Sequence, residues 1–351
     1  MFLFLERQGK EGVSLNSIET KDRIDTLDYL RGFALLGIIL INIVFLLSAQ
    51  MPSPDTINAA YWKFLYLFVE GRFYTIFSFL FGVGFYLFIS RAHSKGKNGT
   101  TLFLRRILVM FLFGLVHYSF HPGEALTVYA VSGLLVLPFY KLKKELNLTI
   151  GLLLLLLFSL LAIKPLLPVA LILLGLTAGQ YRLFEDLAAK RRGIWWCTTI
   201  LFLLTLLVLV YQNKQAPSLS AEGTVEMYWF YHIGIMVGPI VSAFYVSLFV
   251  LLTQVPVIQK LLSPLKYYGR MALTNYILQT AFILFAGYGL KLFGEITYLQ
   301  SLIICLAIYV IQLIFSIMWL RVFRFGPLEW IWRMVTYMEV PPLRLSKPKD
   351  K

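Results

Sequence analysis

Long apolar runs separated by short polar stretches organise almost the whole chain. A transmembrane helix needs about 20 predominantly apolar residues, and ten runs approach or exceed that length. They cover residues 29–48, 66–90, 103–120, 125–140, 147–163, 166–183, 194–211, 227–253, 271–291 and 298–320. The connecting stretches 49–65 and 212–226 are rich in Pro, Ser, Asn and Gln, which predicts loops. The pattern predicts an all-α fold, a polytopic membrane helix bundle of about ten transmembrane helices.

The basic residues set the expected orientation of this bundle. The chain is 59% hydrophobic and 14% charged, with a net charge of +14. Its Lys and Arg lie in short clusters between apolar runs, as the positive-inside rule requires, so we expect no nucleic-acid partner. If the N-terminus is cytoplasmic, that side holds all but five of the 32 Lys and Arg; the five are Lys63, Arg72, Lys164, Lys214 and Lys291. We therefore expect both termini to be cytoplasmic.

Three regions follow from this topology. Residues 1–22 are predicted to be a cytoplasmic N-terminal tail, residues 23–321 the transmembrane domain, and residues 322–351 a basic, aromatic cytoplasmic tail along the inner surface. Residues 254–270 are predicted to form a short interfacial helix. We expect a multi-pass protein of the plasma membrane, surrounded by membrane lipids. The sequence is compatible with a monomer and with a homo-oligomer.

Two apolar runs carry a cation and a polar residue at the same spacing. Arg31 and Asn42 are eleven residues apart, and Arg106 and His117 repeat that interval. Eleven helical residues make about three turns, or ~16 Å, so each pair shares one face. Because polar groups inside a membrane are costly, this arrangement indicates that something is handled within the bilayer.

His117, His121 and Glu124 are close enough in sequence to meet near the outer half of the bilayer. A histidine beside a carboxylate can act as a general base, whereas a buried histidine can also be purely structural. The same three residues resemble a zinc-ligand set, but Pro122 and Gly123 interrupt the helix between them. We therefore expect no metal.

Other polar residues have two interpretations each. Glu70 and Arg72 flank Gly71, and they either pair with each other or line an acceptor mouth. Asn275 and Gln279 are one helical turn apart, and they either join neighbouring helices or line a channel. Arg105 and Arg106 beside Arg31 are the cations best placed to bind the phosphates of a cytosolic cofactor.

Five sequence blocks resemble the YeiB-like membrane proteins, a family with a domain of unknown function. The blocks are Arg23-Ile-Asp25-Thr-Leu-Asp28-Tyr-Leu-Arg31-Gly32, Glu70-Gly-Arg-Phe-Tyr-Thr-Ile-Phe-Ser-Phe-Leu-Phe-Gly82, Arg105-Arg106 with Gly114-Leu-Val-His117, Gly269-Arg-Met-Ala-Leu-Thr-Asn275-Tyr276-Ile-Leu-Gln279, and Phe325-Gly326-Pro327-Leu328-Glu329-Trp330. They occur in order over nearly the whole chain, which makes the set specific although each block alone is weak.

The resemblance implies a place in the transmembrane acyltransferase superfamily, with the acyltransferase-3 sugar acylases and heparan-alpha-glucosaminide N-acetyltransferase. Such proteins take an acyl group, often acetyl, from cytosolic acyl-CoA to a hydroxyl or amine beyond the membrane. The acceptor here would be an envelope glycan or a small molecule. Asn42 stands where the acyltransferase-3 branch has a histidine. The heparan-modifying branch also has Asn there and carries its catalytic histidine in the following external loop, but the corresponding loop here, residues 49–62, contains no histidine.

These departures give His117 the role of base, Glu124 that of its orienting partner, and Asn42 that of an oxyanion or orienting donor. Arg31, Arg105 and Arg106 would anchor the acyl-CoA. The alternative function is a transporter or flippase for small molecules or lipids, in which the same polar groups line a passage.

Overall fold

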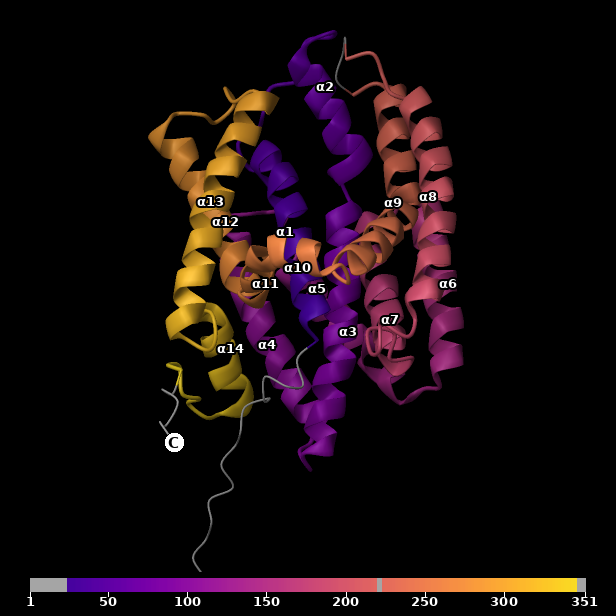
Figure 1. Cartoon of the computed structure of the whole chain (residues 1–351). Helices are drawn as coiled ribbons and strands as arrows, with labels where there is room; N and C mark the ends of the chain where they lie inside the picture. The colour runs from indigo at the N-terminus through magenta and orange to yellow at the C-terminus, as the bar shows by residue number, and fades with distance from the viewer. Residues whose placement is uncertain (1–23, 220–222, 346–351) are drawn as a thin grey trace, which may run out of the picture.

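A computed structural model describes residues 24–219 and 223–345, and the predicted N-terminal tail, 1–22, lies outside them. The described chain is a bundle of helices (Figure 1), which confirms the all-α fold. The elements are α1 (Asp25–Leu46), α2 (Ile57–Phe64), η2 (Leu65–Val69), α3 (Arg72–Ser94), α4 (Gly99–Tyr118), α5 (Leu126–Val136), η3 (Leu137–Lys141), α6 (Lys144–Leu160), η4 (Lys164–Leu166), α7 (Leu167–Gln180), α8 (Arg191–Lys214), α9 (Val225–Leu252), α10 (Pro256–Leu261), α11 (Ser263–Arg270), α12 (Ala272–Gly289), α13 (Tyr298–Val322) and α14 (Pro327–Tyr337).

Each of the ten predicted segments contains a helix, but the predicted count of ten spans is not confirmed. Six helices of the described residues are long and apolar enough to cross a membrane, or seven if α11 and α12, which meet at 88°, count as one span. The helical stretches Leu126–Lys141 and Lys164–Gln180 are shorter. Residues 57–64, predicted to be a loop, instead form α2, so the second span starts earlier than expected.

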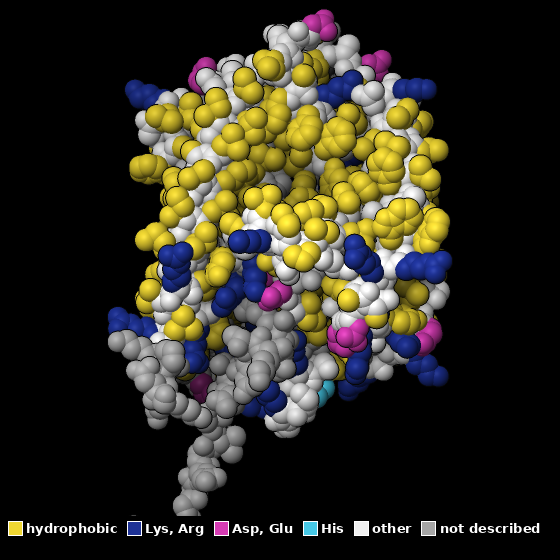
Figure 2. Space-filling model, in the orientation of Figure 1, with side chains coloured by type: hydrophobic (Ala, Val, Ile, Leu, Met, Phe, Trp, Pro, Cys, Tyr) yellow, Lys and Arg dark blue, Asp and Glu magenta, His cyan; other side chains and the backbone are white. Residues whose placement is uncertain are grey.

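The protein's surface is that of a membrane protein. Figure 2 shows hydrophobic side chains over a broad area of one face, with Lys and Arg gathered at its edges. Exposed apolar residues on α8 and α13 include Leu203, Leu207 and Val310. So many exposed leucines are stable only in contact with lipid, so α8 and α13 face the hydrocarbon of the bilayer.

Glycines let the central helices approach closely. A Cβ on Gly32 of α1 would lie 2.2 Å from the carbonyl oxygen of Leu265 on α11, and one on Gly269 would lie 1.9 Å from that of Asp28. On α3, a Cβ on Gly82 would lie 2.1 Å from the carbonyl oxygen of Ile172 on α7. The backbones therefore touch, as is typical of small residues at membrane helix contacts.

A buried amide network fixes α12 against its neighbours. Asn275 donates to the Tyr268 carbonyl and to Ser316 Oγ, at 3.0 and 2.9 Å. Gln279 donates to the Leu35 carbonyl and to the Tyr268 hydroxyl, at 3.1 and 2.7 Å. These bonds tie α12 to α1, α11 and α13 and so hold the wall on which the candidate site is built.

Arg72 has a comparable role at the start of α3. It is 1% exposed and donates to the carbonyls of Glu70 and Gly234 and to Gln212 Oε1, at 2.6, 3.1 and 2.7 Å. Gly71, with φ +76°, makes the turn that lets α3 begin there. The guanidinium thus ties α3 to α8 and α9.

Candidate active site

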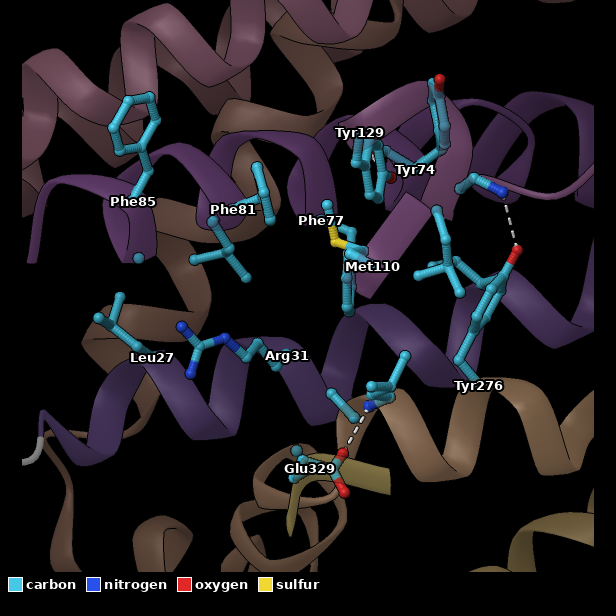
Figure 3. Close-up of a pocket in the computed structure, with 18 of the residues that line it drawn as sticks. Leu27, Arg31, Tyr74, Phe77, Phe81, Phe85, Met110, Tyr129, Tyr276 and Glu329 are labelled. Atoms are coloured by element: carbon cyan, nitrogen blue, oxygen red, sulfur yellow. Dashed lines mark hydrogen bonds between the residues drawn. The ribbon is translucent and has the colours of Figure 1, made fainter. Parts of the chain in front are cut away.

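One large cavity runs through the middle of the described bundle. Its volume is about 1070 Å³, and α1, α3, α4, α5, α12 and α14 supply its walls. Figure 3 shows Arg31 and Tyr276 in this cavity, with aromatic side chains of α3 between them on the opposite wall. The cavity therefore has a basic end at Arg31 and a polar end deeper in the bundle, at Tyr276 and Glu124, which we call the inner end. An apolar middle joins the two.

The basic end holds arginines that the sequence analysis places on the cytoplasmic side. Six arginines line it: Arg31, Arg91, Arg106, Arg270, Arg324 and Arg333. Arg31 pairs with Asp28 at 3.1 Å, and its Nη2 atom would lie 3.2 Å from a Cβ on Gly84, so the glycine leaves room for the guanidinium. Arginines outnumber the carboxylates there, which makes this end suited to anions.

Arg106 and Arg105 are placed differently although they are neighbours in sequence. The Arg106 guanidinium lies over the rings of Trp332 and Phe88, at 3.6 and 5.0 Å from the centroids. Arg105 is exposed and is not part of the cavity wall. Of the two arginines, only Arg106 lies where it could contact a phosphate bound in the cavity.

Helix α14 is a wall of the cavity, which the sequence did not predict. Trp332 donates from Nε1 to the Arg106 carbonyl at 2.8 Å. Glu329 accepts the backbone N–H of Leu273 and of Thr274, at 2.8 and 3.0 Å, and so caps the first turn of α12. Burial raises the pKa of Glu329 above its ordinary value, although the hydrogen bonds from Thr274 oppose this. Residues 327–337 thus form part of the wall at the cavity mouth, where the sequence predicted a tail along the membrane surface.

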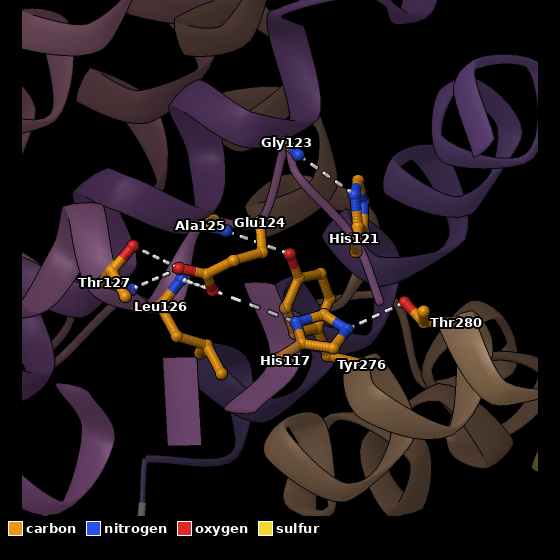
Figure 4. A network of polar contacts seen from close by, with 9 residues as sticks. All are labelled: His117, His121, Gly123, Glu124, Ala125, Leu126, Thr127, Tyr276 and Thr280. Atoms are coloured by element: carbon orange, nitrogen blue, oxygen red, sulfur yellow. Dashed lines mark hydrogen bonds and ion pairs between the residues drawn. The ribbon is translucent and has the colours of Figure 1, made fainter. Parts of the chain in front are cut away.

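The inner end is built around Glu124, which precedes α5 and makes the polar contacts drawn in Figure 4. Glu124 also lines the cavity. Its carboxylate accepts the N–H of Leu126 at 2.6 Å and that of Thr127 at 2.8 Å, as well as the Thr127 hydroxyl. Burial alone would raise the pKa of Glu124, but the adjacent His117 side chain and the hydrogen bonds from Thr127 and Leu126 outweigh it and lower the pKa. A fixed, ionised carboxylate therefore faces the cavity.

His117 stands directly behind Glu124. Its Nδ1 atom lies 3.8 Å from Glu124 Oε2, and its Nε2 atom shares a hydrogen bond with Thr280 Oγ1 at 2.9 Å. The imidazole is 3% exposed and is not part of the cavity wall. The structure thus joins His117 and Glu124, as the sequence predicted, with the carboxylate on the cavity side.

His121 is buried beside this pair but does not reach the cavity. Its Nδ1 atom accepts the N–H of Gly123 at 3.3 Å, and its ring is 5.6 Å from that of His117, centroid to centroid. Within the described part of the chain, its Nε2 atom has no hydrogen-bond partner. Burial and the neighbouring His117 lower the pKa of His121 to about 4, so the ring is neutral at pH 7.

The remaining predicted residues divide between the cavity and the surrounding packing. Asn42 and Glu70 line the cavity. Glu70 pairs with Lys164 at 2.5 Å instead of with Arg72, and Lys164 is also part of the wall. Arg72, Asn275 and Gln279 lie outside it, in the helix-joining contacts described above. Among residues 24–219 and 223–345, no cluster of His, Cys, Asp and Glu has the arrangement of a metal site.

Comparisons with known proteins divide the chain into two matched halves. The family model described as heparan-alpha-glucosaminide N-acetyltransferase, catalytic, matches residues 23–189. The model described as a protein of unknown function, DUF418, matches residues 178–339. No solved structure matches the chain.

Curated relatives match over almost the full chain. An uncharacterized 39.9 kDa protein from Bacillus acidopullulyticus, named for its place in an amylase 3' region, is 56% identical and aligns with 96% of this chain and 100% of its own length. YxaH of Bacillus subtilis and YeiB of Escherichia coli, both described as uncharacterized, are each 27% identical; they align with 94% and 92% of this chain and each with 98% of its own length. The chain therefore belongs to the YeiB-like family of multi-pass membrane proteins, with a first half that resembles a membrane acetyltransferase.

Proposed function

We propose that this protein is a membrane-embedded acyltransferase that moves an acetyl or other acyl group from cytosolic acyl-CoA to a hydroxyl or amine on the far side of the membrane. The observation that carries the proposal is the continuous cavity that joins six arginines to the buried Glu124–His117 pair. A phosphate-bearing donor and a proton acceptor can both be held along one such passage.

The basic end suits the nucleotide part of acyl-CoA. Its phosphates need cations, and arginine guanidinium groups bind phosphate oxygens in a fixed geometry. Arg31 and Arg106 come from different helices and both line the mouth, which α14 narrows with Trp332. The aromatic middle of the cavity then suits the extended arm that carries the thioester.

The inner end suits the transfer step. The acceptor must lose a proton as it attacks the thioester carbonyl, and a positioned base supplies about 10²–10⁴-fold acceleration. Glu124 faces the cavity, so its carboxylate receives this proton, and His117 behind it completes the acid–base pair. Asn42, which also lines the cavity, is an amide donor that orients the reactants.

Donor binding can be tested without knowing the acceptor. Protein in lipid nanodiscs is titrated with CoA by calorimetry, alongside Arg31→Gln and a matched Arg105→Gln control. Arg31 lines the cavity and Arg105 does not, so Arg31→Gln is expected to weaken binding at least tenfold and Arg105→Gln less than twofold. Wild-type protein that does not bind CoA, or equal losses in both variants, would contradict the proposal.

Turnover is tested with acetyl-CoA and an extract of the cell envelope as the acceptor source. Release of the CoA thiol is followed by colour reaction, and acetylated products are identified by mass spectrometry. Thiol release that matches product formation supports acyl transfer. Binding of CoA with neither thiol release nor an acetylated product would remove the catalytic part of the proposal.

A carrier is the second candidate, because one observation favours it. The same cavity is also lined by Glu70 and Lys164, which the sequence places on the outer side, so the cavity extends towards both faces. Proteoliposomes loaded with acetyl-CoA that is labelled on both its CoA part and its acetyl group, with an extract of the cell envelope outside as the acceptor source, distinguish the two functions. Outward movement of the whole molecule indicates a carrier, whereas an acyltransferase retains CoA inside and releases only the acyl group.

A further inference from the structure

Tyr276 is a cavity residue to which the proposed mechanism gives no role. It projects from α12 beside Glu124 (Figure 4), and both side chains are part of the cavity wall. Its ring is 6% exposed and packs edge-on against His117, with the ring centroids 5.0 Å apart. The tyrosine is therefore held rigidly at the end of the cavity where the acyl group would react.

The Tyr276 hydroxyl is oriented by a backbone contact. The N–H of Ala125 donates to its oxygen at 3.1 Å (Figure 4). To the residues that the structure describes, this is the hydroxyl's one hydrogen bond. A phenol that accepts one bond still has its own proton to donate. The donor is thus positioned through its oxygen, and its proton remains available to a molecule in the cavity.

We propose that Tyr276 is a catalytic residue that donates a hydrogen bond to the thioester carbonyl oxygen as negative charge develops on it. This inference rests on the proposed acyltransferase function and names a residue that performs its central step. Donors fixed before the reaction stabilise such an oxyanion strongly because they need no reorganisation in the transition state.

Atoms and electrons balance in this step. The acceptor oxygen or nitrogen forms a bond to the thioester carbonyl carbon while its proton passes to Glu124. The carbonyl π electrons move onto the oxygen, which receives the Tyr276 hydrogen bond. The carbonyl then re-forms as the carbon–sulfur bond breaks, and the CoA thiolate leaves with the proton returned from Glu124. No oxidant, reductant or further reactant is needed.

The neighbouring contacts distinguish this role from a purely structural one. Packing on His117 uses the ring, which phenylalanine would retain. The hydroxyl contributes only one accepted bond to the described fold, from the residue that precedes α5. Removing the hydroxyl should therefore affect the reaction much more than the fold or the binding of CoA.

The test compares Tyr276→Phe with a matched control, Tyr245→Phe, which removes a phenol hydroxyl that donates to the Phe68 carbonyl at 3.1 Å and lies outside the cavity wall. Acetyl-CoA turnover, CoA affinity and thermal midpoint are measured for both variants and for wild type. Losing one oxyanion donor costs about 10²–10³ in kcat, so kcat of Tyr276→Phe should fall ~100-fold, with KM for acetyl-CoA and the Kd for CoA changed less than threefold. Tyr245→Phe should retain at least half of the wild-type kcat.

The outcomes distinguish the role of Tyr276 from the proposed function. Active wild-type protein with nearly unchanged kcat in Tyr276→Phe overturns the role of Tyr276 and leaves the acyltransferase function in place. A raised Kd for CoA in Tyr276→Phe makes the tyrosine a binding residue and also overturns the proposal. Wild-type protein that binds no CoA and turns over no acetyl-CoA overturns the proposed function, and the role of Tyr276 with it.

Discussion

Glu124 lies between His117 and the central cavity. Its Oε2 atom is 3.8 Å from His117 Nδ1, while its side chain forms part of the cavity wall and the imidazole does not. Thr280 holds the other ring nitrogen on the far side. A substrate in the cavity would therefore meet the carboxylate first, and the histidine would act through it.

This order predicts unequal effects of two substitutions. Glu124→Gln removes the group that contacts the acceptor, so kcat should fall by about 10³-fold, within the range for general-base residues. His117→Gln leaves that carboxylate in place and should cost only about tenfold to 100-fold. Steady-state kinetics with acetyl-CoA measure both. If His117→Gln proved the more damaging, the histidine itself would be the base, as the sequence alone suggests.

Thr280 should matter through the orientation of His117. Thr280→Val removes the hydroxyl that holds Nε2 and leaves a buried polar atom unsatisfied, which costs about 1–3 kcal/mol. Turnover is expected to fall about tenfold, as expected for loss of ~1.4 kcal/mol in the transition state. Thr280→Ser keeps the hydroxyl and should restore turnover; an equal loss in both variants would point to packing instead of the hydrogen bond.

Replacing glycine by alanine should affect the stability of the fold differently at two positions, Gly82 and Gly193. Gly82→Ala would place a Cβ 2.1 Å from the Ile172 carbonyl oxygen, so α3 and α7 must separate and the thermal midpoint should fall. A Cβ added to Gly193 of α8 would have nothing within 4 Å. Gly193→Ala should leave stability unchanged or raise it by up to about 1 kcal/mol, because alanine favours helix. Thermal unfolding in detergent compares them, and a Gly82→Ala protein as stable as Gly193→Ala would refute the close contact.

Acid should destabilise the protein through His121. The pKa of this histidine is lowered to about 4 in the folded chain, against about 6.5 when unfolded. Between these values the unfolded chain binds more protons, so stability falls as the pH drops from about 6.5 towards 4. His121→Gln should flatten the decline in thermal midpoint over that range. His93→Gln, a change at an exposed histidine, should leave the decline as steep as in wild type. A wild-type midpoint independent of pH would contradict the burial of a neutral ring.

Contacts that are local in sequence were predictable, and distant ones were not. His117 and Glu124 were expected to meet because only seven positions separate them across one turn. Arg105 and Arg106 could not be told apart, since neighbouring helical positions face about 100° apart and the sequence alone does not say which faces inward.

The walls contributed by distant residues were missed for the same reason. Trp332 bonds to a carbonyl 226 positions earlier, and Tyr276 to an N–H 151 positions earlier. An aromatic, basic segment such as 327–337 has the composition of a surface helix, so its place at the cavity mouth depends on tertiary packing. The predicted count of ten spans is not confirmed by helix length in the described residues, because hydropathy measures how apolar a run is, whereas prolines and turns decide how much of it becomes helix.

Sealed membrane vesicles with the cytoplasmic face inside, loaded with acetyl-labelled acetyl-CoA, would test acyl transfer across the membrane. We expect label to appear on an envelope molecule outside and unlabelled CoA to accumulate inside. Both should depend on Glu124 when Glu124→Gln vesicles are compared with wild type. Label that stays inside with wild-type protein, or intact acetyl-CoA recovered outside, would contradict the proposed transfer.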